Sequence, residues 1–121
     1  MTATTALGAL REQISDAIDT RLYSIEYLEA LVRTGAAHMS STDRAAIAFA
    51  FKTYPSGLRD VHGLVAAGDL NDIVETLIPQ AEAWGRANGC SGALIESRPG
   101  WARILKHHGY EPHQLAVRKE L

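Results

Sequence analysis

The sequence predicts a single α/β domain whose mixed central sheet is covered by helices on both faces. Residues 45–54 and 58–65 read as two strands, and the three-residue turn Pro55-Ser56-Gly57 between them predicts an antiparallel hairpin. A helical segment over residues 70–88 then leads to an apolar strand over residues 92–96, which predicts a parallel crossover. The length of 121 residues suits one domain.

Two helices are expected before the first strand. Residues 5–19 carry apolar side chains at helical spacing. Ser24 is a good N-cap for a second helix, which Gly35 should end. A short strand over residues 36–39 and a polar turn over residues 40–43 follow.

The strand over residues 45–54 has two different apolar faces. One face alternates large side chains and the other alternates small ones, namely Ile47, Phe49 and Phe51 against Ala46, Ala48 and Ala50. A strand that is apolar on both faces is expected to be covered on both. The alanine face indicates a helix packed closely against it. After the next strand, residues 66–69 read as a loop.

The helix over residues 70–88 has the clearest periodicity in the chain, and Pro79 should kink or divide it. After the strand over residues 92–96, Ser97 can cap a short helix that Gly109 ends. Residues 113–120 predict a closing strand, because Leu115 and Val117 share one face.

Composition narrows the classes of function. The formal net charge is -2 and the sequence pI is about 6.2, so nucleic acid is an unlikely partner. The apolar runs are too short for a membrane span, and the N-terminus lacks the pattern of a signal peptide. The single cysteine, Cys90, reads as a small buried residue and fits a reducing, cytoplasmic setting.

The last third of the chain carries a family resemblance. The stretch AEAWGRANGCSGALIESRPGWARILKHHGYEPHQLAVRKEL, residues 81–121, resembles the helix–strand–helix–strand part of the GNAT superfamily of N-acetyltransferases. On this reading the single GNAT-like domain divides into a helix pair (1–35), antiparallel strands (36–65) and an acyl-CoA half (66–121). The chain also resembles small phage- and prophage-encoded members, which suggests a cytoplasmic protein or one incorporated in a phage particle.

The resemblance implies an acetyl-CoA site between two splayed strands. The pyrophosphate would lie on amides at the start of the long helix, where the helix dipole favours anions. The residues that would bind the cofactor are Val65, Asp69, Leu70, Arg98 and Arg103. The segment DLNDIV at the helix start departs from the family's glycine-rich basic loop, because it has neither a glycine nor a basic residue. Where many members have a tyrosine acid, this chain has Leu105.

Three polar residues are candidates for the base of an amine acetylation. Asp60 and His62 stand two apart on one strand and therefore face the same side, and Glu96 ends the next strand. The same residues fit an exposed edge or a subunit contact equally well. No metal site is expected, since the histidines at 107, 108 and 113 lack a cysteine or second carboxylate at ligand spacing.

Two functions remain open at this point. The departures from the family pattern favour a non-catalytic protein that works by assembly, as a homo-oligomer or with a protein partner such as a phage structural protein. The alternative is a small N-acetyltransferase that transfers acetyl from acetyl-CoA to an amine. No cofactor is certain, and acetyl-CoA is expected if the chain is active.

Overall fold

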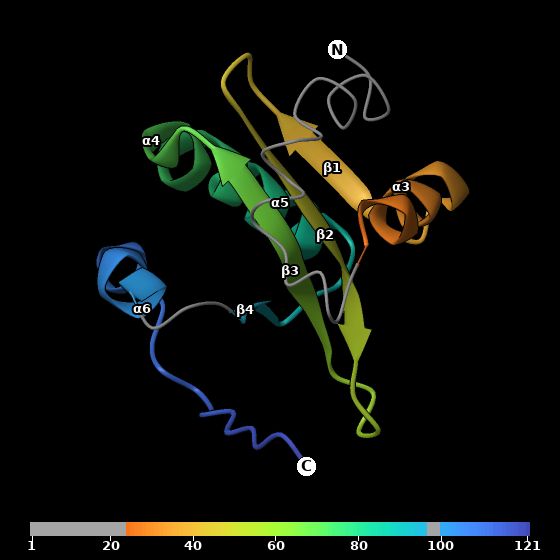
Figure 1. The fold of residues 1–121 in the computed structure, drawn as a ribbon, viewed down its shortest axis with the longest axis vertical. Helices are drawn as coiled ribbons and strands as arrows, with labels where there is room; N and C mark the ends of the chain where they lie inside the picture. The colour runs from red at the N-terminus through yellow and green to blue at the C-terminus, as the bar shows by residue number, and fades with distance from the viewer. Residues whose placement is uncertain (1–23, 97–99) are drawn as a thin grey trace.

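A four-stranded mixed sheet forms the centre of the computed structural model, which describes residues 24–96 and 100–121 (Figure 1). The strands lie in the order β1 (His38–Ser41), β2 (Ala45–Thr53), β3 (Arg59–Gly68) and β4 (Gly92–Ile95). The first three are antiparallel neighbours, and β4 pairs parallel with β3. The predicted mixed sheet is therefore confirmed, while the predicted helix over residues 5–19 lies outside the described residues.

The hairpin between β2 and β3 forms as predicted. Its turn is closed by backbone hydrogen bonds of 2.9 Å from Tyr54 to Leu58 and 2.8 Å from Gly57 to Tyr54. The predicted loop over residues 66–69 is wrong for its first three residues, which extend β3. They do so because they pair with the start of β2, where Gly68 lies opposite Ala45.

The first strand also lies two residues later than predicted, at His38–Ser41 in place of residues 36–39. Its position is set by pairing with β2, in which His38 lies opposite Phe49. Before it, α3 (Ile25–Thr34) begins at Ser24, whose side chain accepts a hydrogen bond from the Tyr27 amide. Gly35 ends this helix in the left-handed conformation, as expected.

Each face of the sheet has its own core. One face packs on the long helix through large side chains of β2 and β3, including Ile47, Phe49 and Val61. The other face packs on α3, where Ile25 and Leu28 meet the small side chains of the sheet. The prediction that the alanine face lies under a helix is confirmed, and helices cover both faces (Figure 1).

The long helix is continuous but not uniform. It consists of α4 (Leu70–Asp72), a π-helical turn η1 (Ile73–Leu77) and α5 (Ile78–Ala87). Pro79 stands in the first turn of α5, where its missing amide costs least. The π-helical turn lies directly before it, where the ring of a proline inside a regular α-helix would clash with a carbonyl. The predicted effect of Pro79 therefore takes the form of a change in helix type just before it, without a break in the helix.

The chain ends in a short helix and an extended tail. Helix α6 (Gly100–Leu105) passes into a 3-10 turn, η2 (Lys106–His108), which Gly109 ends with φ 86°. The predicted strand over residues 113–120 is wrong: residues 111–121 are exposed and form neither helix nor strand. A strand needs a neighbour to satisfy its backbone, and no strand of the described residues pairs with the tail. Within the described residues, no helix is long and apolar enough to cross a membrane.

Candidate functional site

The parallel pairing of β3 with β4 covers only part of β3. β3 pairs with β4 only from Asp60 to Gly63, and β3 then continues to Gly68 while β4 stops at Ile95. Just beyond the paired stretch, the ladder between β2 and β3 has a register shift between Ala48 and Phe49. Part of the β3 edge therefore has no β4 partner, and the splayed pair that the resemblance implies remains a prediction.

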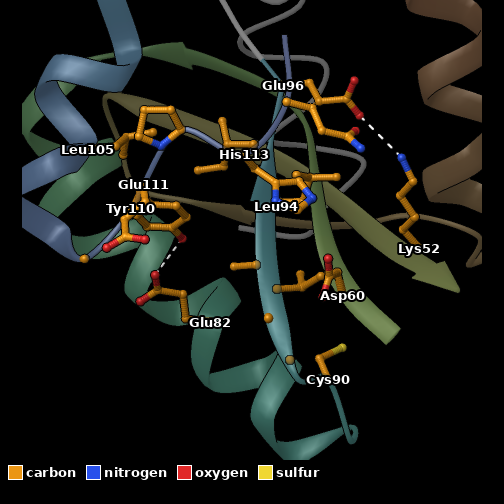
Figure 2. A pocket seen from close by; sticks show the side chains of 18 of the residues that line it. Lys52, Asp60, Glu82, Cys90, Leu94, Glu96, Leu105, Tyr110, Glu111 and His113 are labelled. Carbon is orange, nitrogen blue, oxygen red and sulfur yellow. Dashed lines mark hydrogen bonds and ion pairs between the residues drawn. The ribbon is translucent and has the colours of Figure 1, made fainter. Parts of the chain in front are cut away.

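A charged cluster lies where β4 ends. His62 Nε2 lies 3.0 Å from Glu96 Oε1, and Lys52 Nζ lies 3.7 Å from the same oxygen. Figure 2 shows Lys52 reaching Glu96 along one side of β4. The structure thus brings together two of the three predicted base residues, and His62 is the less exposed of them, at 22% against 59% for Glu96.

The third predicted residue, Asp60, has a different partner. Tyr54 donates a 2.8 Å hydrogen bond from its hydroxyl to Asp60 Oδ2. This hydrogen bond, followed by desolvation, raises the pKa of Tyr54 above its usual 10.0. Lys52 and Tyr54 are not among the residues that the sequence predicts for the site. The signal was present for Lys52, because the short hairpin turn places it directly opposite Asp60.

A network of the chain's own polar groups occupies the start of the long helix. Asp69 is the N-cap and accepts a 2.9 Å hydrogen bond from the Asp72 amide. The Asp72 carboxylate in turn accepts hydrogen bonds from the Thr42 hydroxyl at 2.7 Å and from the Arg44 guanidinium at 2.8 Å. The Asp69 amide donates to the Arg44 carbonyl at 3.0 Å, so the helix start is tied to the turn before β2.

This network favours the ionised form of Asp72. The Thr42 hydrogen bond is the largest cause of a lowered pKa at Asp72; the Arg44 guanidinium adds to it and desolvation opposes it. Two carboxylates therefore stand where the GNAT resemblance would put an anionic pyrophosphate. One of them is neutralised by Arg44, whose side chain is 68% exposed. The acidic cap is readable from the sequence, whereas the contacts of Thr42 and Arg44 with Asp72 are not, because these residues are distant in sequence.

The other residues predicted to bind the cofactor are scattered. Val65 packs against the α3-side core and Leu70 is exposed at the helix start. Arg103 is exposed on α6, whereas Arg98 lies outside the described residues. The structure tests none of these as ligands, and they remain predictions.

The short helix offers no hydroxyl at the position of the family's acid. Leu105 is 4% exposed and belongs to the core on the α5 side. Tyr110 donates a 2.6 Å hydrogen bond to Glu82, and its desolvation raises its pKa well above the usual range. Cys90 is a half-buried free thiol beside the core. In the described ranges, no three His, Cys, Asp or Glu side chains are grouped so that they would hold a metal ion.

Comparison with solved structures identifies the fold. An acetyltransferase of Trypanosoma brucei superposes with a TM-score of 0.69 at 13% identity, covering 98% of this chain and 94% of that one. A ribosomal-protein-alanine N-acetyltransferase of Brucella melitensis gives 0.67 at 15% identity, covering 98% and 92%. The aminoglycoside N-acetyltransferase AAC(6')-Iy, solved with CoA, gives 0.72 at 13% identity, covering 100% and 91%.

Sequence comparison adds nothing to this picture. No protein-family model matches the chain, and no curated protein matches it significantly. At identities this low, structural likeness establishes the fold and leaves the activity open. The chain has the single-domain, mixed α/β fold of the GNAT N-acetyltransferases.

Proposed function

We propose that this GNAT-fold chain does not transfer acyl groups and acts by binding a protein partner in an assembly. The observation that carries the proposal is the start of the long helix. There the Asp69 carboxylate caps the helix by accepting a hydrogen bond from the Asp72 amide. The Asp72 carboxylate is a second negative group at the same helix start. A pyrophosphate at this place would meet two negative side chains, and only Arg44 compensates one of them.

The short helix supports the same proposal. Leu105 fills the core where an acid would have to reach the departing thiolate. Tyr110 is held by Glu82 and has a raised pKa, so its hydroxyl is committed to a structural hydrogen bond. The proposed setting is a phage particle or another protein assembly. It rests on the resemblance of the sequence to small phage-encoded members, described above.

The alternative is an N-acetyltransferase, and one observation favours it. His62 and Glu96 form a 3.0 Å pair where the pairing of β3 with β4 ends, and Lys52 lies 3.7 Å from the same carboxylate. In this alternative the pair would take a proton from the acceptor amine as its nitrogen forms a bond to the acetyl carbon. The bond from that carbon to sulfur would break, and CoA would leave as a thiolate that takes its proton from solvent, since Leu105 has none to give.

Binding of the cofactor decides between the two functions. We expect calorimetric titration with acetyl-CoA and with CoA to show no affinity tighter than about 100 μM, or about 5.5 kcal/mol. AAC(6')-Iy, which was solved with CoA, is the positive control. Tighter binding would contradict the proposal.

A thiol assay tests the chemistry separately. Incubation of the chain with acetyl-CoA and a panel of amines should release no free CoA above the rate without protein. Release that Glu96→Gln abolishes would establish the alternative. Asp43→Asn is a matched control, because this exposed carboxylate lies in the turn between β1 and β2, away from Glu96.

A further inference from the structure

A row of stacked planar side chains crosses the α5 side of the sheet near the hairpin between β2 and β3. The Trp84 ring of α5 stacks on the Phe51 ring of β2, with centroids 4.6 Å apart and planes 20° apart. The Arg59 guanidinium of β3 lies over the same Phe51 ring, 4.5 Å from its centroid. The His38 ring of β1 lies 4.5 Å from the Trp84 ring. Three strands and the long helix thus contribute one planar group each to this stacked row.

The stacked row is only partly covered by the rest of the molecule. The pairing of β1 with β2 ends at Phe49, so Phe51 stands beyond it. Phe49 is 4% exposed, whereas Phe51 is 39% exposed. His38 is exposed, and Trp84 and Arg59 are half-buried. Tryptophan and arginine side chains within reach of solvent are the kind that dominate the binding energy of protein interfaces.

The Arg59 guanidinium has donors that the fold does not use. It donates a 3.5 Å hydrogen bond from Nη1 to the Asn88 carbonyl at the end of α5. Within residues 24–96 and 100–121, no carboxylate lies within ion-pair distance of it. A guanidinium has five N–H donors in a planar fork. Because stacking on Phe51 holds the fork in place, an anion that binds it orders little further side chain.

We propose that the stacked row is the surface through which this chain holds a protein partner, and that the partner presents a carboxylate beside an aromatic or aliphatic side chain. Arg59 binds the carboxylate through two parallel hydrogen bonds. The apolar side chain of the partner covers the exposed part of Phe51. The inference rests on the proposed function, which requires a protein partner, and it adds the surface and the chemistry of that partner.

The charges of the molecule favour this occupant over two others. In an isologous dimer the same patch meets itself. Two stacked rows that carry Arg59 and no carboxylate would leave both guanidinium groups without an anion, so a second copy is a poor occupant. The net charge of -2 gives the chain no general attraction for the backbone of a nucleic acid. A single arginine on such a chain fits a single carboxylate better than a polyanion.

Selection of a random peptide display library on the full chain tests the chemistry of the partner. The enriched peptides should share an aspartate or glutamate next to an aromatic or aliphatic residue. A synthetic peptide of the consensus sequence should bind the chain. Its twin with an amide in place of the carboxylate should bind about tenfold more weakly or worse, since a charge-assisted hydrogen bond is lost. A selection without enrichment, or a consensus without a carboxylate, overturns the proposal.

Two variants test whether the consensus peptide binds at the stacked row. Arg59→Gln should raise the Kd of the peptide about tenfold or more. Arg33→Gln is the matched control, because it removes the same charge from the exposed end of α3 on the other face of the sheet, and it should leave the Kd unchanged. Circular dichroism of both variants verifies the fold. An unchanged Kd in Arg59→Gln overturns the proposal.

The indole N–H resonances show where the peptide lies. Titration with the consensus peptide should shift the resonance of Trp84, which belongs to the stacked row, and leave that of Trp101 in place. Trp101 lies on α6, beside the hollow along β4. A peptide that shifts Trp101 and leaves Trp84 unchanged binds elsewhere and overturns the proposal.

Two further measurements test the other occupants. A dimer of the full chain in sedimentation velocity that Arg59→Gln dissociates would make a second copy the occupant. A single-stranded DNA oligonucleotide that displaces the peptide at equal concentration would make a phosphate the ligand. Either result overturns the proposal. Binding of acetyl-CoA would overturn the proposed function alone, whereas a chain that binds neither acetyl-CoA nor the consensus peptide would overturn this inference alone.

Discussion

Replacing Gly68 with alanine should destabilise the fold far more than the same replacement in the hairpin turn. Gly68 ends β3 with φ 105°, and a Cβ there would overlap the Arg44 carbonyl oxygen and lie 2.7 Å from the Ala45 Cα. Both contacts are with backbone, so no side chain can rotate away. Gly57 is the matched control, because its φ is 90° and nothing lies within 4 Å of the position of its Cβ.

The magnitude follows from these two positions. A side chain in the left-handed region costs about 1–2 kcal/mol, and this cost applies to both variants. At Gly68 the backbone must also move, which adds about 1–3 kcal/mol of overpacking strain. It also weakens the 3.0 Å hydrogen bond from the Asp69 amide to the Arg44 carbonyl, worth about 1 kcal/mol. Gly68→Ala should therefore cost about 3–6 kcal/mol and Gly57→Ala about 1–2 kcal/mol.

Urea unfolding followed by tryptophan fluorescence measures both values. A loss of 3–6 kcal/mol is a large share of the ~5–15 kcal/mol by which domains are stable, so the Gly68→Ala midpoint should fall steeply. Equal losses in the two variants would refute the reasoning, since the contact with β2 would then contribute nothing beyond the strain of φ.

Three further perturbations have defined outcomes. Leu77→Ala should cost about 2–5 kcal/mol in urea unfolding, because Leu77 is fully buried at 0% exposure; a loss below 1 kcal/mol would contradict the core assignment. The pKa of Asp72 is lowered in the fold, so its contribution is present above the unfolded value near 3.8 and is lost as the pH falls through the folded value. In Asp72→Asn, the free energy of unfolding should therefore fall less steeply as the pH is lowered. An unchanged slope would show that Asp72 does not cause the loss of stability in acid. Tyr110→Phe removes the hydrogen bond to Glu82 and should cost about 1–2 kcal/mol in thermal unfolding, whereas Glu111→Gln on the exposed tail should be neutral.

Local signals in the sequence accounted for most of the fold. The alternation of Ile47 and Phe49 with alanines gave the strand and both of its covered faces, and the caps at Ser24 and Gly35 bounded a helix. The errors lie where pairing with a residue distant in sequence determines the secondary structure. Ala66 and its neighbours extend β3 because they pair with the start of β2, and no local pattern contains that partner.

In the tail the error is the reverse, because a strand is predicted where the structure has none. Leu115 and Val117 have the periodicity of a strand, but within residues 24–96 and 100–121 no strand pairs with them, and periodicity alone cannot supply that neighbour. At the site, strand spacing was enough to relate His62 to Glu96 across a parallel pair. It was not enough to find Thr42 and Arg44, because they reach Asp72 across 30 and 28 positions of sequence.

The π-helical turn at Ile73–Leu77 has a consequence for the rotational phase of the long helix. A π turn holds one residue more than the α-helix would, and each residue rotates an α-helix by about 100°. Without that residue, either Asp72 would point away from Thr42 and Arg44 in the turn before β2, or Leu77 would point out of the core. With the extra residue, the start of the helix faces the polar turn before β2, and the rest of the helix keeps its apolar side chains in the core. A chain of this fold with a regular helix here would have to present a different set of side chains at the helix start.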